Sequence, residues 1–370
     1  MARIGIDASR AFVEKPTGVE IYSTELLKSL RNLKESENHN FILYHKGNLD
    51  NNYEFPPNFN LKKINGERFW TIFSLSKEMF LNSPDFLFVP SHTFPFFAPE
   101  PSAITIHDCG WKHFPESYPL KERIYLDQTT KIAVKKASII FADSNFTKKD
   151  LMKFYGAKEE KVKVVYLGFQ SSLRKESDKI IISETLKRFS IKTGSYITVV
   201  GRVDKKKNFE YALKSFNEVS KEFPDLKLVF VGSMGLGSDN FWDLAKKIGI
   251  AGKVVITNYI TSRDLSIILS NSLFLFHPSL FEGFGMTILE AFHLGVPVCC
   301  SNTSSLPEIA GNSALYFDPF IIDDGVEKMR KLINDEKLRK TLVKEGEWQV
   351  KLFSWERCAR ETFEEIFKLL

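Results

Sequence analysis

The sequence has few cysteines and no long apolar run. None of its four cysteines is paired with another in a Cys-x-x-Cys spacing, which argues against a zinc site and against a disulfide framework. No apolar stretch approaches the roughly 18 residues that a membrane-spanning helix needs, and the first residues lack the pattern of a secretory signal. We therefore expect a cytoplasmic protein with reduced thiols.

Charge of one sign is not in large excess either. The chain has 51 basic and 46 acidic residues, a formal net charge of +5, which is too small to indicate a nucleic-acid partner. Apolar residues make up 43% and charged residues 26%, a composition typical of soluble globular proteins. With 370 residues, the chain is long enough for two α/β domains.

Short apolar runs alternate with longer amphipathic stretches along both halves of the chain. This alternation is typical of the βαβ units that build parallel sheets. In the first half we expect strands at 3–7, 41–45, 86–90, 103–107, 138–142 and 162–166, and in the second half at 196–200, 226–231, 253–257, 273–277 and 297–300. The polar stretch 168–178 has no apolar periodicity, so we place the interdomain linker there.

Two acidic residues frame a glycine-containing turn in the second half. Glu282 precedes the turn, and Glu290 follows after seven intervening residues, inside a helix that should end at Gly295. Helix N-termini bind anions because their first amides are unpaired, and glycine lets backbone approach a ligand closely. An isolated pair of this kind would be a loop glutamate and a capping glutamate. The Glu-Gly-Phe-Gly sequence between a strand and a helix favours a binding site instead.

A basic loop, 201–208, directly follows the expected strand 196–200. Loops at the carboxyl ends of parallel strands are where open α/β sheets bind ligands. Arg202 can bind phosphate oxygens through two hydrogen bonds, and Lys207 can contribute a point charge. A lysine run alone indicates a solvated turn, but this one lies after a strand and in the same half as the two glutamates. The position favours a diphosphate site.

These segments together resemble glycosyltransferase family 4, the group 1 retaining glycosyltransferases. Residues 282–290 look like the Glu-x7-Glu motif of that family, and residues 201–208 look like its phosphate loop. The resemblance spans nearly the whole chain, because it continues at 4–10, 17–19, 105–108, 142–147, 295–297, 301–311, 318–319 and 353–356.

The resemblance implies an α/β fold of the GT-B type, with two Rossmann-like domains facing one another across a cleft. The acceptor domain would be residues 1–170, and the nucleotide-sugar donor domain residues 171–353. A terminal helix at 354–370 would cross back and pack on the first domain. The resemblance also implies transfer with retention of the anomeric configuration, through a front-face mechanism.

Roles for individual residues follow from the same resemblance. Arg202 and Lys207 should hold the donor diphosphate, and Glu290 should accept hydrogen bonds from the ribose hydroxyls. Glu282 and His107 should contact the transferred sugar as the catalytic pair. The remaining donor contacts are expected from Gly18, Gly283, Phe284, Gly285, Met286 and Thr287.

The sequence contains no Asp-x-Asp motif, which argues against a metal-dependent sugar transferase. We expect no metal or other cofactor, because Arg202, Lys207 and the helix N-terminus near Gly285 can stabilise the departing diphosphate. The closest resemblance is to members that transfer mannose from GDP-mannose to a glycan or lipid-linked acceptor in polysaccharide assembly. Asn258 stands where glycine is common under the base, so a UDP-sugar donor is the alternative.

Two other functions remain open at this point. The segment 232–237 follows a strand and is glycine-rich, as in nucleotide-dependent oxidoreductases, but its glycines are spaced Gly-x-x-Gly-x-Gly rather than Gly-x-Gly-x-x-Gly. A nucleotide-sugar sensor without catalytic activity would keep the same fold. The joint presence of the five expected donor and catalytic side chains favours an enzyme.

Two surface features have two interpretations each. The basic helix 121–136 could rest peripherally on an anionic membrane at its inner face, or it could be an ordinary surface helix. Phe94, Phe96 and Phe97 could line an acceptor pocket or pack under a loop. The expected partners are therefore a nucleotide-sugar donor and a sugar acceptor, with a membrane surface as an option and without nucleic acid.

Overall fold

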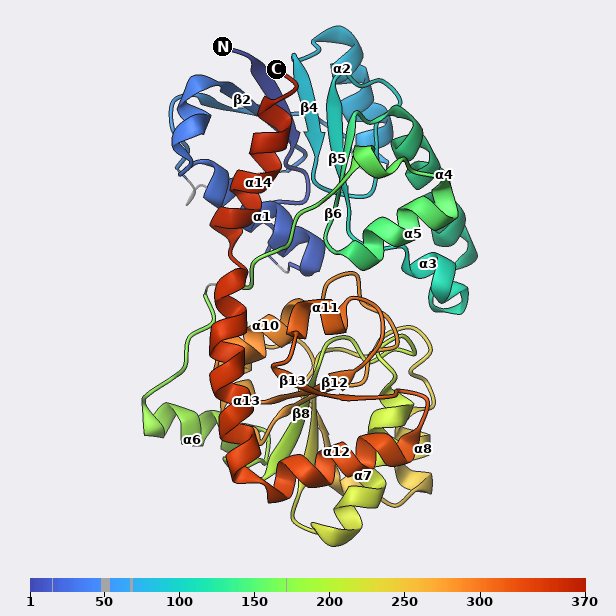
Figure 1. The fold of residues 1–370 in the computed structure, drawn as a ribbon, viewed down its shortest axis with the longest axis vertical. Coiled ribbons are helices and arrows are strands. Elements are labelled where there is room, and N and C mark those ends of the chain that lie inside the picture. Colours follow the sequence, from blue (N-terminus) through green and yellow to red (C-terminus); the bar gives the residue numbers. More distant parts are fainter. Residues whose placement is uncertain (15, 48–53, 67–68, 171) are drawn as a thin grey trace. The chain divides into compact units, whose positions relative to one another are not determined.

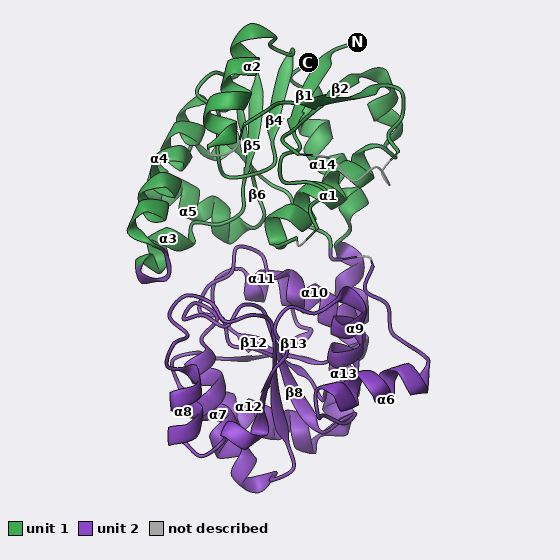
Figure 2. Ribbon diagram, turned by 180° about the vertical axis from the view of Figure 1, so that it is seen from behind, with its two compact units in different colours: residues 1–115, 119–168, 353–370 green, residues 116–118, 169–352 purple. Residues whose placement is uncertain are grey.

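The computed structural model describes residues 1–14, 16–47, 54–66, 69–170 and 172–370. The chain forms two compact α/β units, which Figure 2 distinguishes by colour. Unit 1 consists of residues 1–115, 119–168 and 353–370, and unit 2 of residues 116–118 and 169–352. Each unit contains one parallel sheet with helices packed against it (Figure 1).

Unit 1 is built on a seven-stranded parallel sheet in the order β3-β2-β1-β4-β5-β6-β7. Its strands are β1 (Arg3–Asp7), β2 (Asn40–His45), β3 (Phe59–Lys63), β4 (Phe86–Val89), β5 (Ser102–Ile106), β6 (Ile139–Ala142) and β7 (Val162–Val164). Its α-helices are α1 (Gly18–Leu30), α2 (Ser76–Leu81), α3 (Gly110–His113), α4 (Leu120–Lys136), α5 (Asn145–Tyr155) and α14 (Trp355–Phe367). The central strands are buried along their whole length, as expected for a parallel sheet covered on both faces.

Unit 2 is built on a six-stranded parallel sheet in the order β10-β9-β8-β11-β12-β13. Its strands are β8 (Tyr196–Val200), β9 (Lys227–Val231), β10 (Val254–Ile256), β11 (Leu275–His277), β12 (Val298–Ser301) and β13 (Ala314–Phe317). Its α-helices are α6 (Lys179–Arg188), α7 (Phe209–Glu222), α8 (Phe241–Lys247), α9 (Ser262–Ser270), α10 (Met286–His293), α11 (Leu306–Ala310), α12 (Ile322–Asn334) and α13 (Glu336–Gln349).

Short 3-10 or π turns occur in both units. They are η1 (Lys34–Asn38), η2 (Thr71–Leu75), η3 (Pro115–Ser117), η4 (Glu159–Lys161), η5 (Ala251–Lys253) and η6 (Val350–Leu352).

All eleven strands expected from the sequence are present, and their ends differ from the expected ones by at most two residues. The sequence analysis missed β3 and β13, which lie at the outer edges of their sheets. In β3 only Phe59 is buried, so its apolar content is too low to stand out as a strand. Edge strands of this kind are defined by pairing with a neighbour, which the local pattern does not reveal.

The last helix belongs to unit 1 although the chain reaches it from unit 2. Helix α14 packs beside α1, and its Phe363 ring contacts Phe41 and Phe88 of the sheet. A Cβ atom at Gly168 would lie 2.6 Å from the backbone nitrogen of Trp355, so the chain leaving β7 needs glycine where it passes this helix. In the described ranges no helix is both long and apolar enough to cross a bilayer.

Candidate active site

Two loops of unit 2 leave neighbouring strands at the point where the strand order reverses. The loop 201–208 follows β8, and the loop 278–285 follows β11, which is paired with β8. Successive strands continue from β8 in one direction and from β11 in the other. A crevice at such a switch point is the usual ligand site of open α/β sheets. Two segments far apart in the sequence are thereby brought to one place.

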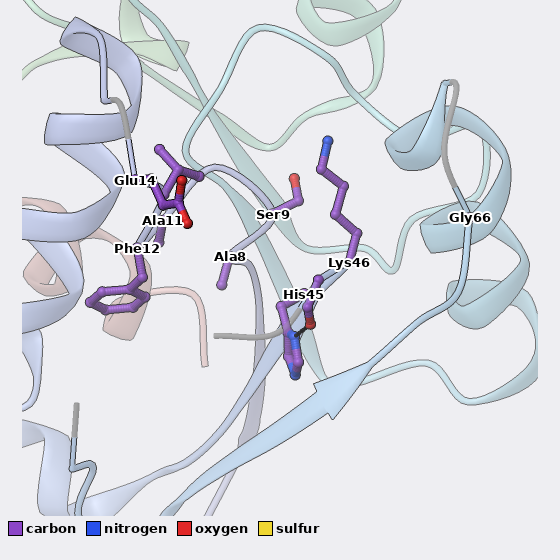
Figure 3. A pocket seen from close by; sticks show the side chains of 10 residues that line it. Ala8, Ser9, Ala11, Phe12, Glu14, His45, Lys46 and Gly66 are labelled. Carbon is purple, nitrogen blue, oxygen red and sulfur yellow. Dashed lines mark hydrogen bonds between the residues drawn. The ribbon is translucent and has the colours of Figure 1, made fainter. Parts of the chain in front are cut away.

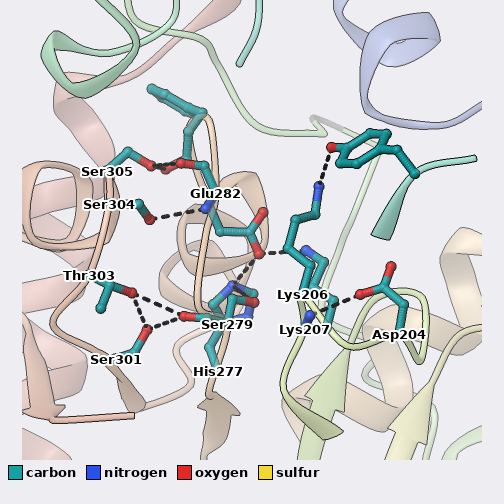
Figure 4. A network of polar contacts seen from close by, with 12 residues as sticks. Asp204, Lys206, Lys207, His277, Ser279, Glu282, Ser301, Thr303, Ser304 and Ser305 are labelled. Carbon is teal, nitrogen blue, oxygen red and sulfur yellow. Dashed lines mark hydrogen bonds and ion pairs between the residues drawn. The ribbon is translucent and has the colours of Figure 1, made fainter. Parts of the chain in front are cut away.

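The basic loop is held in shape by its own backbone. The carboxylate of Asp204 accepts a hydrogen bond of 2.9 Å from the backbone N–H of Lys207 (Figure 4). Asn208 adopts a left-handed conformation with φ 56° and caps the N-terminus of α7, while its side-chain amide donates to the carbonyl of Pro319 at 3.2 Å. The carbonyl of Lys206 accepts from the backbone N–H of Leu280 at 2.9 Å, so the two loops are joined.

The glycine-rich segment after β9 supports this basic loop. A Cβ atom at Gly235 would lie 2.6 Å from the side chain of Arg202, and one at Gly232 would lie 2.1 Å from the carbonyl oxygen of Gly201. The backbone N–H of Gly235 also donates to the carbonyl of Val203 at 2.8 Å. The glycines are therefore needed for close packing against the loop of Arg202. They do not open a helix as a dinucleotide fingerprint does, because α8 begins only at Phe241.

Glu282 and Lys207 form an ion pair across the two loops. The Nζ atom of Lys207 lies 2.5 Å from Oε1 of Glu282, and the exposed fractions of the two side chains are 22% and 14%. Nε2 of His277 lies 3.0 Å from the same carboxylate oxygen. Burial alone would raise the pKa of Glu282, but the charges of Lys207 and His277 and the hydrogen bond from His277 hold it well below its ordinary value. The carboxylate is therefore ionised at neutral pH.

The sequence analysis did not assign a role to His277. It ends β11 and is almost fully buried, at 1% exposed, five residues before Glu282. The only local signal is a histidine at the carboxyl end of a strand, which by itself indicates a core residue more often than a functional one. Its contact with Glu282 depends on the path of the loop and is visible only in three dimensions.

Hydroxyl groups at the end of β12 and just after it hold the turn that contains Glu282. Ser301 and Thr303 donate to the carbonyl of Ser279 at 2.5 Å and 3.1 Å (Figure 4). The backbone N–H of Glu282 donates to Oγ of Ser304 at 3.0 Å, and the hydroxyl of Ser305 donates to the carbonyl of Glu282 at 3.0 Å. The turn is thus fixed from the neighbouring strand, which preorganises the carboxylate.

The residues of the turn place the start of α10 beside Glu282. Gly285 has φ +105° and lies immediately before the helix, and a Cβ atom there would lie 2.9 Å from Leu306. Gly283 is half-buried and Phe284 is buried, while Met286 and Thr287 are the first two helical residues. The expected helix end is confirmed, because Gly295 adopts φ +66° just after α10. The first amides of a helix have no intrahelical acceptor and can point at an anion.

Glu290 is the fifth residue of α10 and is 7% exposed. In the described part of the chain its carboxyl group has neither an ion pair nor a hydrogen bond, and burial raises its pKa from 4.5 to about 7. A buried carboxyl group without a partner is costly, and this cost suggests a ligand that supplies hydrogen-bond donors.

In unit 1, His107 follows β5 and is paired with a residue that the sequence analysis did not single out. Its Nδ1 lies 2.7 Å from Oδ2 of Asp143, which follows β6, and both side chains are buried. Nε2 of His107 has no hydrogen-bond partner among the residues that the structure describes. Burial alone would lower the pKa of His107, but Asp143, Asp108 and the carbonyl of Pro90 raise it above its ordinary value. The pair favours an imidazolium ion.

Gly18, one of the expected donor contacts, is exposed and is the first residue of α1, directly after the loop that follows β1. The start of this helix is held by the carboxylate of Glu20, which accepts a hydrogen bond of 3.0 Å from the backbone N–H of Thr17. Arg10 pairs with the same carboxylate group at 3.0 Å. Gly18 is therefore a helix N-terminal residue whose amide is available.

Unit 1 also contains a cavity of about 500 Å³ at the carboxyl ends of β1 and β2. Figure 3 shows Ser9 and Lys46 on one side of it and Phe12 and Glu14 on the other. The lining residues are Ala8, Ser9, Ala11, Phe12, Val13, Glu14, His45, Lys46, Gly47 and Gly66. The cavity has the size and the mixed polar and apolar lining of a small-molecule site.

Family comparisons identify what these loops belong to. Residues 183–348 match the family described as "Glycosyl transferases group 1", and residues 16–172 match "Glycosyltransferase Family 4". The chain belongs to the group 1 glycosyltransferases. It is therefore an enzyme of the glycosyltransferase class, as the resemblance implied.

Relatives of this glycosyltransferase agree in fold. It is 27% identical over 276 residues to "O-antigen chain mannosyltransferase B" of Escherichia coli, which covers 73% of this chain and 71% of the relative. Sucrose-phosphate synthase of Thermosynechococcus elongatus superimposes with a TM-score of 0.77 at 16% identity, covering 100% of this chain and 99% of that one. HepE of Anabaena in complex with UDP-glucose gives 0.76 at 15% identity, covering both chains fully. The GT-B fold is thereby confirmed.

Proposed function

We propose that this glycosyltransferase transfers a hexose from a nucleotide sugar to a glycan or lipid-linked acceptor in polysaccharide assembly, with retention of the anomeric configuration. The proposed hexose is mannose and the proposed donor is GDP-mannose. The observation that carries the proposal is the meeting of Lys207 and Glu282 at the switch point of the unit 2 sheet, 2.5 Å apart. The name of the Escherichia coli relative supports mannose. The UDP-glucose complex of HepE supports a UDP-sugar as the alternative donor, although that protein shares only the fold.

The donor diphosphate is assigned to the basic loop and to the start of α10. Arg202 is exposed and Lys207 partly exposed, so both are accessible to a ligand. A diphosphate would compete with Glu282 for Lys207, and the displaced carboxylate would keep its hydrogen bond to His277. Charge that develops on the departing diphosphate would be stabilised by groups already in place, without a metal or other cofactor. In the described segments no three metal-ligating side chains come together.

Glu290 is assigned to the ribose of the donor. Two vicinal hydroxyls can donate to the two oxygens of one carboxylate, and no described residue now makes those hydrogen bonds. A donor that binds in this way should favour the ionised carboxylate and lower its pKa. The buried carboxyl group would thus gain the partners that it lacks in the free protein.

His107 is assigned to the transferred sugar and the cavity of unit 1 to the acceptor. With Nδ1 bonded to Asp143, Nε2–H of the imidazolium can donate a hydrogen bond to a sugar hydroxyl. The cavity offers Lys46, Glu14 and Ser9 for hydrogen bonds to sugar hydroxyls and Phe12 for apolar contact with a sugar ring. The acceptor would then be recognised by unit 1 and the donor by unit 2.

A titration of the purified protein with nucleotide sugars tests the donor proposal. We expect GDP-mannose to bind with an affinity that EDTA does not change. The affinity should fall at least about tenfold in Lys207→Ala and in Glu290→Ala, which is the loss typical of a charge-assisted hydrogen bond. Lys214→Ala is the matched control, since Lys214 is an exposed lysine on α7 that pairs only with Glu210 in the described structure. Tighter binding of UDP-glucose would select the UDP-sugar donor. Binding of NAD alone, or of none of these ligands, would refute the donor site.

A further inference from the structure

Unit 1 carries a surface of exposed phenylalanine side chains. Six phenylalanines in the described chain are more than about a third exposed, and five of them lie between residues 69 and 97. Their exposed fractions are 50% for Phe69, 59% for Phe73, 69% for Phe80, 46% for Phe96 and 57% for Phe97. Leu81, at 60%, adjoins Phe80. Exposed aromatic rings scattered singly need no explanation, but this concentration does.

The exposed rings form two contacting groups that meet at the chain neighbours Phe96 and Phe97, and we name the two groups together the aromatic surface. The ring centroids of Phe80 and Phe97 lie 5.3 Å apart, and those of Phe73 and Phe96 lie 6.4 Å apart. Phe69 lies 6.3 Å from Phe73. The backbone N–H of Phe97 donates to Oγ of Ser76 at 2.8 Å, which fixes the loop after β4 against α2. The rings are therefore held outward by an ordered scaffold.

Helix α4 borders the aromatic surface with positive charge. Its Tyr125 ring lies 5.6 Å from that of Phe69, and Nζ of Lys136 donates to the carbonyl of Phe96 at 2.7 Å. Lys121 lies one turn before Tyr125, and Lys135 adjoins Lys136. Lys121 and Lys135 are exposed, and neither forms an ion pair within the described residues. Exposed Ile124, on the same side of the helix, continues the apolar surface.

Acidic side chains near this border are mostly neutralised. Helix α4 has five basic residues and only two acidic ones, and Asp127 is paired with both Lys112 and Lys131. On α2, Glu78 is paired with Lys62 at 2.5 Å. The free charge beside the aromatic surface is therefore positive. Aromatic side chains flanked by lysines have the composition of a helix or loop that lies in the interface of an anionic bilayer.

We propose that the aromatic surface and the lysines of α4 dock unit 1 on an anionic lipid bilayer, with Phe73, Phe80 and Phe97 in the interface and Lys121 and Lys135 against the lipid phosphates. The charge selects this occupant over a second copy of the chain, because two copies of the surface would bring lysines of the same sign together. The proposal rests on unit 1 alone and is independent of the donor chemistry.

Sedimentation with lipid vesicles tests the docking surface. The wild-type protein should co-sediment with vesicles of equimolar phosphatidylglycerol and phosphatidylcholine, and much less with pure phosphatidylcholine. The variant F73S/F80S/F97S should lose at least about tenfold in partitioning because it removes the apolar contact. The variant K121Q/K135Q should lose about fivefold for each lysine and should respond less to added salt.

Matched controls separate docking from folding and from catalysis. Phe320 is the remaining exposed phenylalanine and belongs to unit 2, so F320S should sediment like the wild type. K246Q/K247Q removes two exposed lysines of α8 and should also have no effect. Circular dichroism and GDP-mannose titration without vesicles should be the same for the surface variants and the wild type.

Several results would overturn the proposal. A folded wild-type protein that does not co-sediment with anionic vesicles would exclude the bilayer as the occupant of the aromatic surface. Equal sedimentation of F73S/F80S/F97S and the wild type would place binding elsewhere. A wild-type dimer that becomes monomeric in F73S/F80S/F97S, without vesicle binding, would identify a second copy of the chain as the occupant.

Discussion

Oδ2 of Asp143 lies 2.7 Å from Nδ1 of His107 inside unit 1, and this contact raises the pKa of the imidazole against the effect of burial. A second pair with the same distance, His113 and Asp150, lies elsewhere in unit 1. The first pair follows strands β5 and β6 at the edge of the sheet where ligands bind. We regard Asp143 as a positioning residue and His107 as the group that touches the sugar.

Asp143→Asn should lower the pKa of His107 from above its ordinary value to below it. Once the carboxylate is removed, burial is the dominant influence, and burial favours the neutral imidazole. Transfer activity should fall at least about tenfold near neutral pH, because the imidazole of His107 loses both its fixed orientation and its positive charge. NMR titration of the imidazole and a pH profile of kcat check this. Asp150→Asn is the control, and an equal loss of activity there would contradict the assignment.

Glu290→Gln should stabilise the protein while weakening donor binding. The pKa of Glu290 is raised from 4.5 to about 7, so the ionised carboxylate destabilises the folded state increasingly as pH rises through this window. The free energies of unfolding of Glu290→Gln and the wild type should differ by about 3 kcal/mol at most. This difference is reached above pH 7 and is absent below pH 4.5. Urea unfolding of both proteins across this range checks the stability. Equal stability of Glu290→Gln and the wild type at all pH values would contradict the claim that Glu290 is buried without a partner.

Lys207→Ala should destabilise the protein by about 3 kcal/mol at neutral pH, because it leaves a buried carboxylate with only His277. The double variant K207A/E282Q should recover part of that loss, since no charge then remains unpaired. The pKa of Glu282 is depressed, so the wild type should hold this stabilisation above pH 4.5 and lose it as pH falls further. A double-mutant cycle by urea unfolding measures the coupling, and additive single effects would refute the ion pair.

Gly235→Ala should weaken donor binding without touching the donor. The new methyl group would lie 2.6 Å from the side chain of Arg202 and 3.0 Å from the carbonyl of Val203, so Arg202 must move. We expect about a tenfold rise in the dissociation constant, the cost of one misplaced charged hydrogen bond. Gly252→Ala is the control, because a methyl group there meets no atom within 4 Å. Calorimetry compares the two variants.

The sequence predicted the sheets well wherever a strand is buried on both faces. Strands such as β8 are continuous apolar runs, and a chain segment of that kind can only lie inside a covered sheet. The edge strands β3 and β13 were missed because they depend on pairing with a neighbour.

The site was predicted as a set of residues but not as a network. Spacing identified Glu282, Glu290 and Lys207, since each lies next to a recognisable strand or turn. It could not identify His277 or Asp143, whose partners lie five and 36 residues away in the chain. The first contact depends on the path of the loop after β11, and the second on the pairing of β5 with β6. The glycines after β9 were noticed as a motif, but their purpose became clear only from their contact with the loop of Arg202.

The most direct test of the central claim is amide hydrogen exchange with and without GDP-mannose. The account predicts that the donor slows exchange in two segments of unit 2, residues 201–208 and residues 283–290, because their amides and side chains hold the diphosphate and ribose. The control segment 179–188, which is helix α6, should exchange equally in both states. Saturating donor that leaves both segments unprotected, or protects other residues only, would contradict the account.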